Sequence, residues 1–182
     1  VFHANCLAKS VDGWRLNDAG GGLILDSTIH DIDTLRFLLG TEPLSVFAMT
    51  QSGRKSVSGI EDGLMAVIRF PGDVLVQIHG SYAVPYAPGG IEIYGDKAAL
   101  IARDCMSQKP VGSLALRNAE GEQPISLTHH NLYRYSVARF LGAINGKGTP
   151  AATGEDGVAS LRIALALKES VRTGQEIKVI PS

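Results

Sequence analysis

The sequence predicts an α+β domain, with one mostly antiparallel, open-faced β-sheet and helices packed on one of its faces. Segments with the apolar pattern of strands outnumber segments with helical spacing, and they follow one another in meander order. The chain has 182 residues, 45% hydrophobic content and a net charge of -1, which suffices for one globular domain with a sizeable core. No repeat or linker divides it, so residues 1–182 are expected to form a single domain.

The expected elements follow from apolar spacing and from the turn formers between them. Strands are expected at residues 1–9, 43–51, 62–70, 74–83, 90–95, 97–103, 112–118, 123–128 and 176–180. Helices are expected at residues 25–39, 130–146 and 155–173. The sequence PGD at 71–73 predicts a tight hairpin, Gly40 ends the first helix, and the loop DGWRLNDAGGG precedes that helix.

The helix expected at residues 25–39 carries two stripes. Its apolar stripe, which would face the core, comprises Leu25, Ile29, Ile32, Leu35 and Leu39. A neighbouring polar stripe holds Asp26, His30 and Asp33, within about 60° of one another at 100° per residue. A solvated helix face with an acid in its first turn is one explanation. Three proton-holding groups directly after a glycine run indicate a functional site as the other.

Two kinds of chemistry fit the polar stripe. A carboxylate beside an imidazole can fix its tautomer and favour its protonation, which produces a general acid or base near neutral pH. Two carboxylates and an imidazole can alternatively bind a divalent metal. The remaining histidines are His3, His79, His129 and His130, and none has a recognisable ligand spacing. The sequence therefore favours acid–base chemistry and no metal.

Composition limits the compartment and the partners. No apolar run approaches the roughly 20 residues that cross a bilayer, and the N-terminus lacks a secretion signal, so a soluble cytoplasmic protein is expected, with no membrane partner. Cys6 and Cys105 are far apart without a CxxC spacing, which predicts reduced, buried thiols. The scattered lysines and arginines argue against a nucleic-acid partner.

Several motifs occur in a characteristic order. They are WR at 14–15, GGG at 20–22, D-x-x-x-H-x-x-D at 26–33, ED at 61–62, GIEIYGDKAAL at 90–100 and TGEDGVASLRIALALKESVRTGQ at 153–175. As a set they resemble the C-terminal substrate domain of the Gfo/Idh/MocA oxidoreductases. Thr28 stands where many members carry glycine, and this variant resembles inositol 2-dehydrogenases, which favours a cyclitol or sugar substrate.

The resemblance implies a two-domain enzyme. An N-terminal Rossmann domain, which this chain lacks, would bind NAD or NADP. The glycines at 20–22 do not replace it, since they lack the preceding strand and the following ribose-binding acid of a dinucleotide fingerprint; they are expected to let the backbone turn tightly against the substrate pocket. The resemblance also implies homodimers or homotetramers through the open sheet face. Runs such as LMAVI and VLVQI put apolar side chains on both faces of the sheet, which supports self-association.

The resemblance assigns a role to each candidate site residue. His30 matches the general base that takes the hydroxyl proton as hydride leaves the same carbon. Asp26 would orient or polarise His30, Asp33 would bind substrate or support the site, and Trp14 and Arg15 would line the pocket rim. The expected function is the catalytic and substrate domain of an NAD(P)-dependent dehydrogenase that acts on a secondary alcohol of a polyol or sugar, inactive as this fragment alone. A non-catalytic binding or oligomerisation module is the alternative.

Overall fold

A computed structural model describes residues 2–6, 13–17, 20–52, 59–84, 86–87, 89–107 and 109–180, with the backbone alone at 2–6 and 17. The Cys6 thiol, the His3 side chain and residues 1 and 7–9 of the first expected strand lie outside this description. No helix in the described part of the chain is long and apolar enough to cross a membrane.

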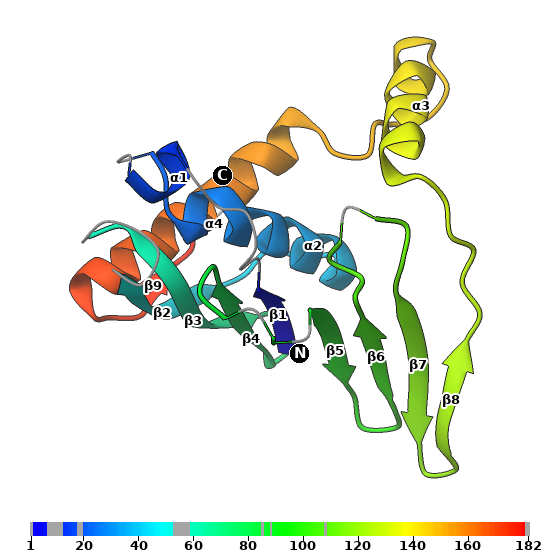
Figure 1. The fold of residues 1–182 in the computed structure, drawn as a ribbon, viewed down its shortest axis with the longest axis horizontal. Coiled ribbons are helices and arrows are strands. Elements are labelled where there is room, and N and C mark those ends of the chain that lie inside the picture. Colours follow the sequence, from blue (N-terminus) through cyan, green and yellow to red (C-terminus); the bar gives the residue numbers. More distant parts are fainter. Residues whose placement is uncertain are drawn as a thin grey trace.

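The described residues form one nine-stranded sheet in the order β8-β7-β6-β5-β1-β4-β3-β2-β9 (Figure 1). Its strands are β1 (Phe2–Cys6), β2 (Ser45–Ser52), β3 (Glu61–Phe70), β4 (Val74–Ser81), β5 (Gly90–Tyr94), β6 (Ala99–Arg103), β7 (Ser113–Asn118), β8 (Gly121–Ile125) and β9 (Ile177–Lys178). Every neighbouring pair is antiparallel except β1 with β4. The expected α+β class with a mostly antiparallel sheet is confirmed.

The predicted meander order of the strands is wrong for β1. β1 lies in the middle of the sheet, parallel to β4 and antiparallel to β5, so it joins two meanders that share no other pairing in the described sheet. At the other end of the sheet, β8 begins two residues earlier than expected. A tight turn at residues 119–120 pairs Asn118 with Gly121 and thereby sets the start of that strand.

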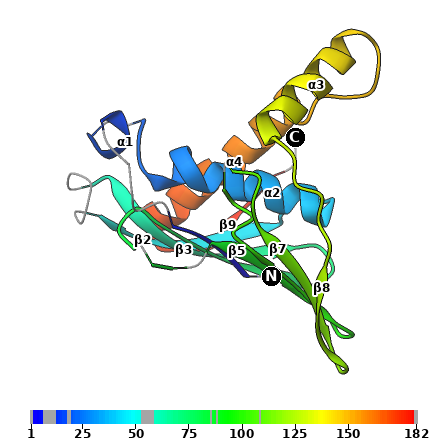
Figure 2. The ribbon, with the colours of Figure 1, turned by 45° about the vertical axis from the view of Figure 1, so that its right-hand side comes forward.

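The helices are α1 (Trp14–Asn17), η1 (Ile24–Thr28), α2 (Ile29–Leu39), α3 (Leu132–Ile144) and α4 (Gly154–Thr173). The short α1 lies inside the segment that was expected to be a loop. Figure 2 shows α1, α2 and α4 on one face of the sheet, as expected, and none of the described helices on the opposite face. Local signals define the helix ends: Gly40 and Gly174 adopt the left-handed conformation after α2 and α4.

The core lies between the helix layer and strands β2 to β4. Ile32 and Leu35 of the expected apolar stripe are buried in it, and Leu25, Ile29 and Leu39 pack against it while partly exposed. Leu23 and Ile24 are also buried, although the spacing did not include them.

The helix begins with a π-helical turn, η1. The Ile29 N–H donates to the Ile24 carbonyl, five residues back, so this turn contains more residues than an α-helical one. The face buried by the helix therefore shifts, and it takes in Thr28 and Asp31, which are fully buried.

Candidate functional site

The glycine run at residues 20–22 lies where backbone segments approach closely. The Gly22 N–H donates to the Arg15 carbonyl at 2.9 Å, which fastens α1 to the start of η1. A Cβ at Gly21 would lie 2.5 Å from the Trp14 carbonyl oxygen. Gly22 has φ = +94°, and a Cβ there would collide with the Glu61 carboxylate. The glycines are therefore required by packing against α1 and Glu61.

Glu61, the first residue of β3, binds the beginning of η1. Its carboxylate, only 9% exposed as a residue, accepts the backbone N–H of Ile24 at 3.2 Å. Lys168 of α4 lies 3.9 Å from the same oxygen. Because an acid already occupies this helix start, the glycine turn does not fit a dinucleotide phosphate.

Asp26 is the centre of a polar cluster. Arg15 Nε donates to its Oδ1 at 2.9 Å, and the Tyr82 hydroxyl donates to its Oδ2 at 2.7 Å. The Arg15 guanidinium in turn lies 4.9 Å from the centre of the half-exposed Trp14 ring. The structure thus brings together Trp14, Arg15 and Asp26, three of the five residues singled out in the sequence.

Tyr82 was not predicted as a site residue. Its ring is 1% exposed and its hydroxyl reaches out to Asp26. Burial, and then its hydrogen bond to the Asp26 carboxylate, raises the pKa of Tyr82 far above its ordinary value. The phenol therefore remains a neutral donor at every physiological pH and helps to keep Asp26 in one orientation.

His30 lies one helical turn after Asp26, on the exposed side of α2. The described residues provide no hydrogen bond or ion pair to its imidazole, and both Asp26 oxygens accept from other groups. The expected orientation of His30 by Asp26 is therefore not part of this arrangement. The His30 side chain is exposed.

Asp33 belongs to a different network. Its Oδ1 accepts from Ser160 Oγ at 3.1 Å and from Arg36 Nη1 at 3.2 Å. Arg36 also binds Glu42 and, at 3.6 Å, the Asp156 carboxylate. Its hydrogen bond to Glu42 is the main reason that the pKa of Arg36 is raised. Asp33 thus braces α2 against α4, and the structure does not bring it into the Asp26 cluster.

The other titratable residues noted in the sequence lie elsewhere. His129 and His130 are exposed before α3, and with Cys105 they line a hollow of about 300 Å³ beside β7. Cys105 is a free thiol, half-buried, and burial raises its pKa. Within the described ranges no three His, Cys, Asp or Glu side chains are grouped to hold a metal ion.

Comparison with known proteins identifies a family that this chain resembles. Residues 2–101 match the model of the GFO/IDH/MocA C-terminal domain. The chain is 46% identical over 181 residues to 1,5-anhydro-D-fructose reductase from Ensifer adhaerens, covering 98% of this chain and 54% of that protein. It is 31% identical over 169 residues to inositol 2-dehydrogenase from Rhizobium meliloti, covering 87% and 50%.

A solved structure shares the fold. Aldose-aldose oxidoreductase from Caulobacter crescentus superposes with a TM-score of 0.86 at 22% identity, covering 97% of this chain and 54% of that one. The chain spans about half the length of each of these relatives.

Proposed function

The chain belongs to the GFO/IDH/MocA family through its C-terminal domain, and from this premise we propose that it is the substrate domain of an NAD(P)-dependent oxidoreductase. The reaction that we propose is oxidation of a secondary alcohol of a sugar or cyclitol, or its reversal. The names of the 46% and 31% identical relatives, a sugar reductase and an inositol dehydrogenase, support this substrate class. The observation that carries the proposal is the exposed His30 beside a fixed Arg15–Asp26–Tyr82 cluster.

In this proposal each residue has a defined task. His30 accepts the proton of the substrate hydroxyl through its exposed imidazole, as a general base. Asp26, held at both oxygens, keeps lone pairs free to accept a hydrogen bond from a neighbouring hydroxyl. Trp14 offers an apolar surface to the C–H groups of a sugar ring. A nicotinamide supplies the hydride acceptor when it is bound.

Asp33 is proposed to act indirectly. Its bonds to Ser160 and Arg36 fix α2 against α4, and α2 carries His30 in its first turn. Direct substrate binding by Asp33 has less support, because its carboxylate already has two donors.

Dinucleotide binding tests whether the cofactor is bound by residues 1–182 or by the rest of a full-length parent. We expect residues 1–182 to bind neither NAD nor NADP measurably, since Glu61 closes the glycine turn at residues 20–22. The parent should bind one of them and oxidise a member of a panel of inositols and sugars. Calorimetric titration and a steady-state assay measure both expectations. Micromolar binding by residues 1–182 would overturn our account of the glycines.

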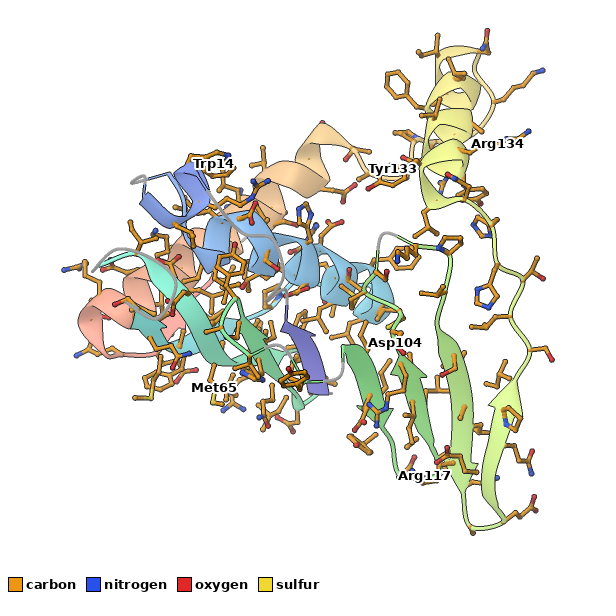
Figure 3. All side chains as sticks on the ribbon, in the orientation of Figure 1. Trp14, Met65, Asp104, Arg117, Tyr133 and Arg134 are labelled. Carbon is orange, nitrogen blue, oxygen red and sulfur yellow. The ribbon has the colours of Figure 1, made fainter. Side chains whose placement is uncertain are left out.

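Self-association through the open sheet face is a second expectation. Phe47, Met49, Met65, Val67 and Leu75 are exposed on strands β2 to β4, and Figure 3 shows Met65 projecting away from the helices. Pairing of two copies through this face would remove its apolar side chains from water, which favours association. Analytical ultracentrifugation at tens of micromolar should therefore detect an oligomer that Met65→Lys weakens.

The matched control for this substitution is Leu127→Lys, at an exposed leucine outside the sheet. It should leave the oligomer intact. A strictly monomeric parent, or equal weakening by the two substitutions, contradicts assembly through the sheet face.

Tyr82→Phe tests the Asp26 cluster in the parent. Phenylalanine fills the same buried space but cannot donate to Asp26, and a hydrogen bond to a charged group contributes about 1.5–3 kcal/mol. We expect kcat to fall about tenfold with little change in KM, because Asp26 loses one of its two fixed donors. Tyr94→Phe is the control, since Tyr94 also donates to a carboxylate, that of Glu92, but on the distant β5. Equal kinetics for the two variants would remove Tyr82 from the site.

A further inference from the structure

Two methionines form a cross-strand pair on the open face of the sheet. Met49 of β2 and Met65 of β3 are register partners in the antiparallel ladder between these strands. Directly opposite side chains in such a ladder share a face and have Cβ atoms about 4.5–5.5 Å apart. Both side chains are well exposed, at 68% and 60%, and Figure 3 shows Met65 on the side of the sheet away from the helices. The two thioethers therefore lie side by side at the surface.

The methionine pair belongs to an apolar patch. Phe47 and Val67, two positions along the same strands, are register partners of each other and are 38% and 47% exposed. Side chains two positions apart on a strand share a face, so these residues form a second row beside the methionines. Leu75 of β4 is 50% exposed on the same face. We call these five residues the methionine patch.

A thioether can be made polar by a reversible oxidation. A hydroperoxide transfers one oxygen atom to the sulfur, so that an S–O bond forms and the O–O bond breaks. The sulfur is oxidised by two electrons, and the peroxide is reduced to water or an alcohol, which keeps the peroxide proton. The product is a polar sulfoxide in place of an apolar side chain. The aliphatic and aromatic members of the methionine patch do not undergo this reaction.

The other described side chains that contain sulfur are less suited to such a change. Cys105 is a half-buried thiol, and burial raises its pKa, which lowers the fraction of the thiolate that reacts with oxidants. Met106 is only partly exposed and lies in the turn after β6, outside the methionine patch. Among these described groups, an oxidant therefore alters an apolar surface chiefly at Met49 and Met65.

We propose that Met49 and Met65 form a reversible oxidation site that controls the pairing of two copies through the sheet face. The proposal rests on the self-association that we expect for the parent as part of the proposed function. Pairing would bury both thioethers, so a hydroperoxide oxidises them in the unpaired copy. A sulfoxide buried between two copies loses its hydrogen bonds to water, so oxidised copies pair less tightly. Methionine sulfoxide reductases restore the thioethers and, with them, the apolar face.

Peroxide treatment of the full-length parent tests the accessibility of the pair. Dilute hydrogen peroxide is added at protein concentrations below and above the midpoint of self-association, and peptide mass spectrometry follows each methionine. Met49 and Met65 should oxidise before Met106 at the low concentration and more slowly at the high one, since pairing increases with concentration. Met106 should oxidise at one rate throughout. Earlier oxidation of Met106, or no effect of concentration on Met49 and Met65, would overturn the proposal.

Analytical ultracentrifugation measures what oxidation does to pairing. After oxidation, the dissociation constant of the paired copies should rise by about tenfold or more, because polar groups would be buried without partners. Treatment with the two methionine sulfoxide reductases, one for each sulfoxide epimer, and dithiothreitol should return the original constant. An unchanged constant in protein that is fully oxidised at Met49 and Met65 would also overturn the proposal.

A double substitution separates this pair from every other oxidisable group of the parent. Met49→Leu combined with Met65→Leu keeps the patch apolar at a similar volume but removes both thioethers. The dissociation constant of this variant should be the same before and after peroxide. Met106→Leu is the matched control, and it should keep the full peroxide response. A peroxide response in the double variant, or its loss with Met106→Leu, would contradict the assignment.

The proposal and the expectations on which it rests fail in different ways. A parent that is monomeric before oxidation loses both the assembly through the sheet face and its control by oxidation. A parent that pairs through the sheet face but remains equally paired after oxidation loses only the control. Neither result changes the proposed oxidoreductase activity, which kinetics on sugars and inositols measure separately.

Discussion

Replacing His30 with alanine in the full-length parent should lower turnover by about 10²- to 10⁴-fold, the usual contribution of a general base. The same substitution should change the free energy of unfolding by no more than about 0.5 kcal/mol, as expected for an exposed side chain. The imidazole has no partner among the described residues, and the buried Ile32 and Leu35 hold α2 in place without it. Steady-state kinetics on inositols and sugars, with thermal melts, measure both effects.

His129→Ala provides the control for a lost imidazole, since His129 is exposed before α3 and outside the Asp26 cluster. It should leave turnover unchanged. If His30→Ala instead keeps near-parental turnover and lowers the melting temperature by many degrees, the polar stripe is structural and the catalytic assignment is wrong.

Replacing Gly22 with alanine should lower the free energy of unfolding by about 1–3 kcal/mol or more. The backbone at Gly22 has φ = +94°, and holding an L-residue in such a conformation costs about 1–3 kcal/mol. The added Cβ would also displace the Glu61 carboxylate, which leaves the Ile24 N–H without its acceptor. We expect the urea midpoint of unfolding to fall by an amount that corresponds to at least the backbone strain of about 1–3 kcal/mol.

Gly20→Ala is the internal control for this experiment. A Cβ at Gly20 meets no atom within 4 Å, and its φ is not in the left-handed region. Its unfolding midpoint should match that of the unmodified protein. Similar midpoints for the Gly20 and Gly22 variants would show that neither the φ angle nor Glu61 constrains the run.

Features set by neighbouring residues could be predicted from the sequence. The left-handed Gly40 ends α2, the turn at 71–73 joins β3 to β4, and the stripe that contains Ile32 and Leu35 faces the core. In each case the conformation depends on side chains within a few positions. Local periodicity is sufficient information for such features.

Features set by distant residues could not be predicted. Tyr82, the residue after β4, reaches Asp26, and no spacing within one element indicates that contact. Asp33 appeared aligned with Asp26 and His30 because a helical wheel shows only angles. Its partner Ser160 lies on another helix. The π-helical turn likewise buries Ile24 and Thr28, which the apolar spacing along the helix does not indicate.

The central place of β1 imposes an order on folding. Within each meander, strands that follow one another in the sequence pair with each other, but β1 pairs His3 with Ile78 on one side and with Ile91 on the other. During synthesis β1 leaves the ribosome before its two partner strands, β4 and β5. Both edges of β1 stay unpaired until those strands have been made. Closing loops of that length is the entropically slow step. Nascent chains are therefore most exposed to mispairing and aggregation while β1 waits, and chaperone dependence should be greatest during that interval.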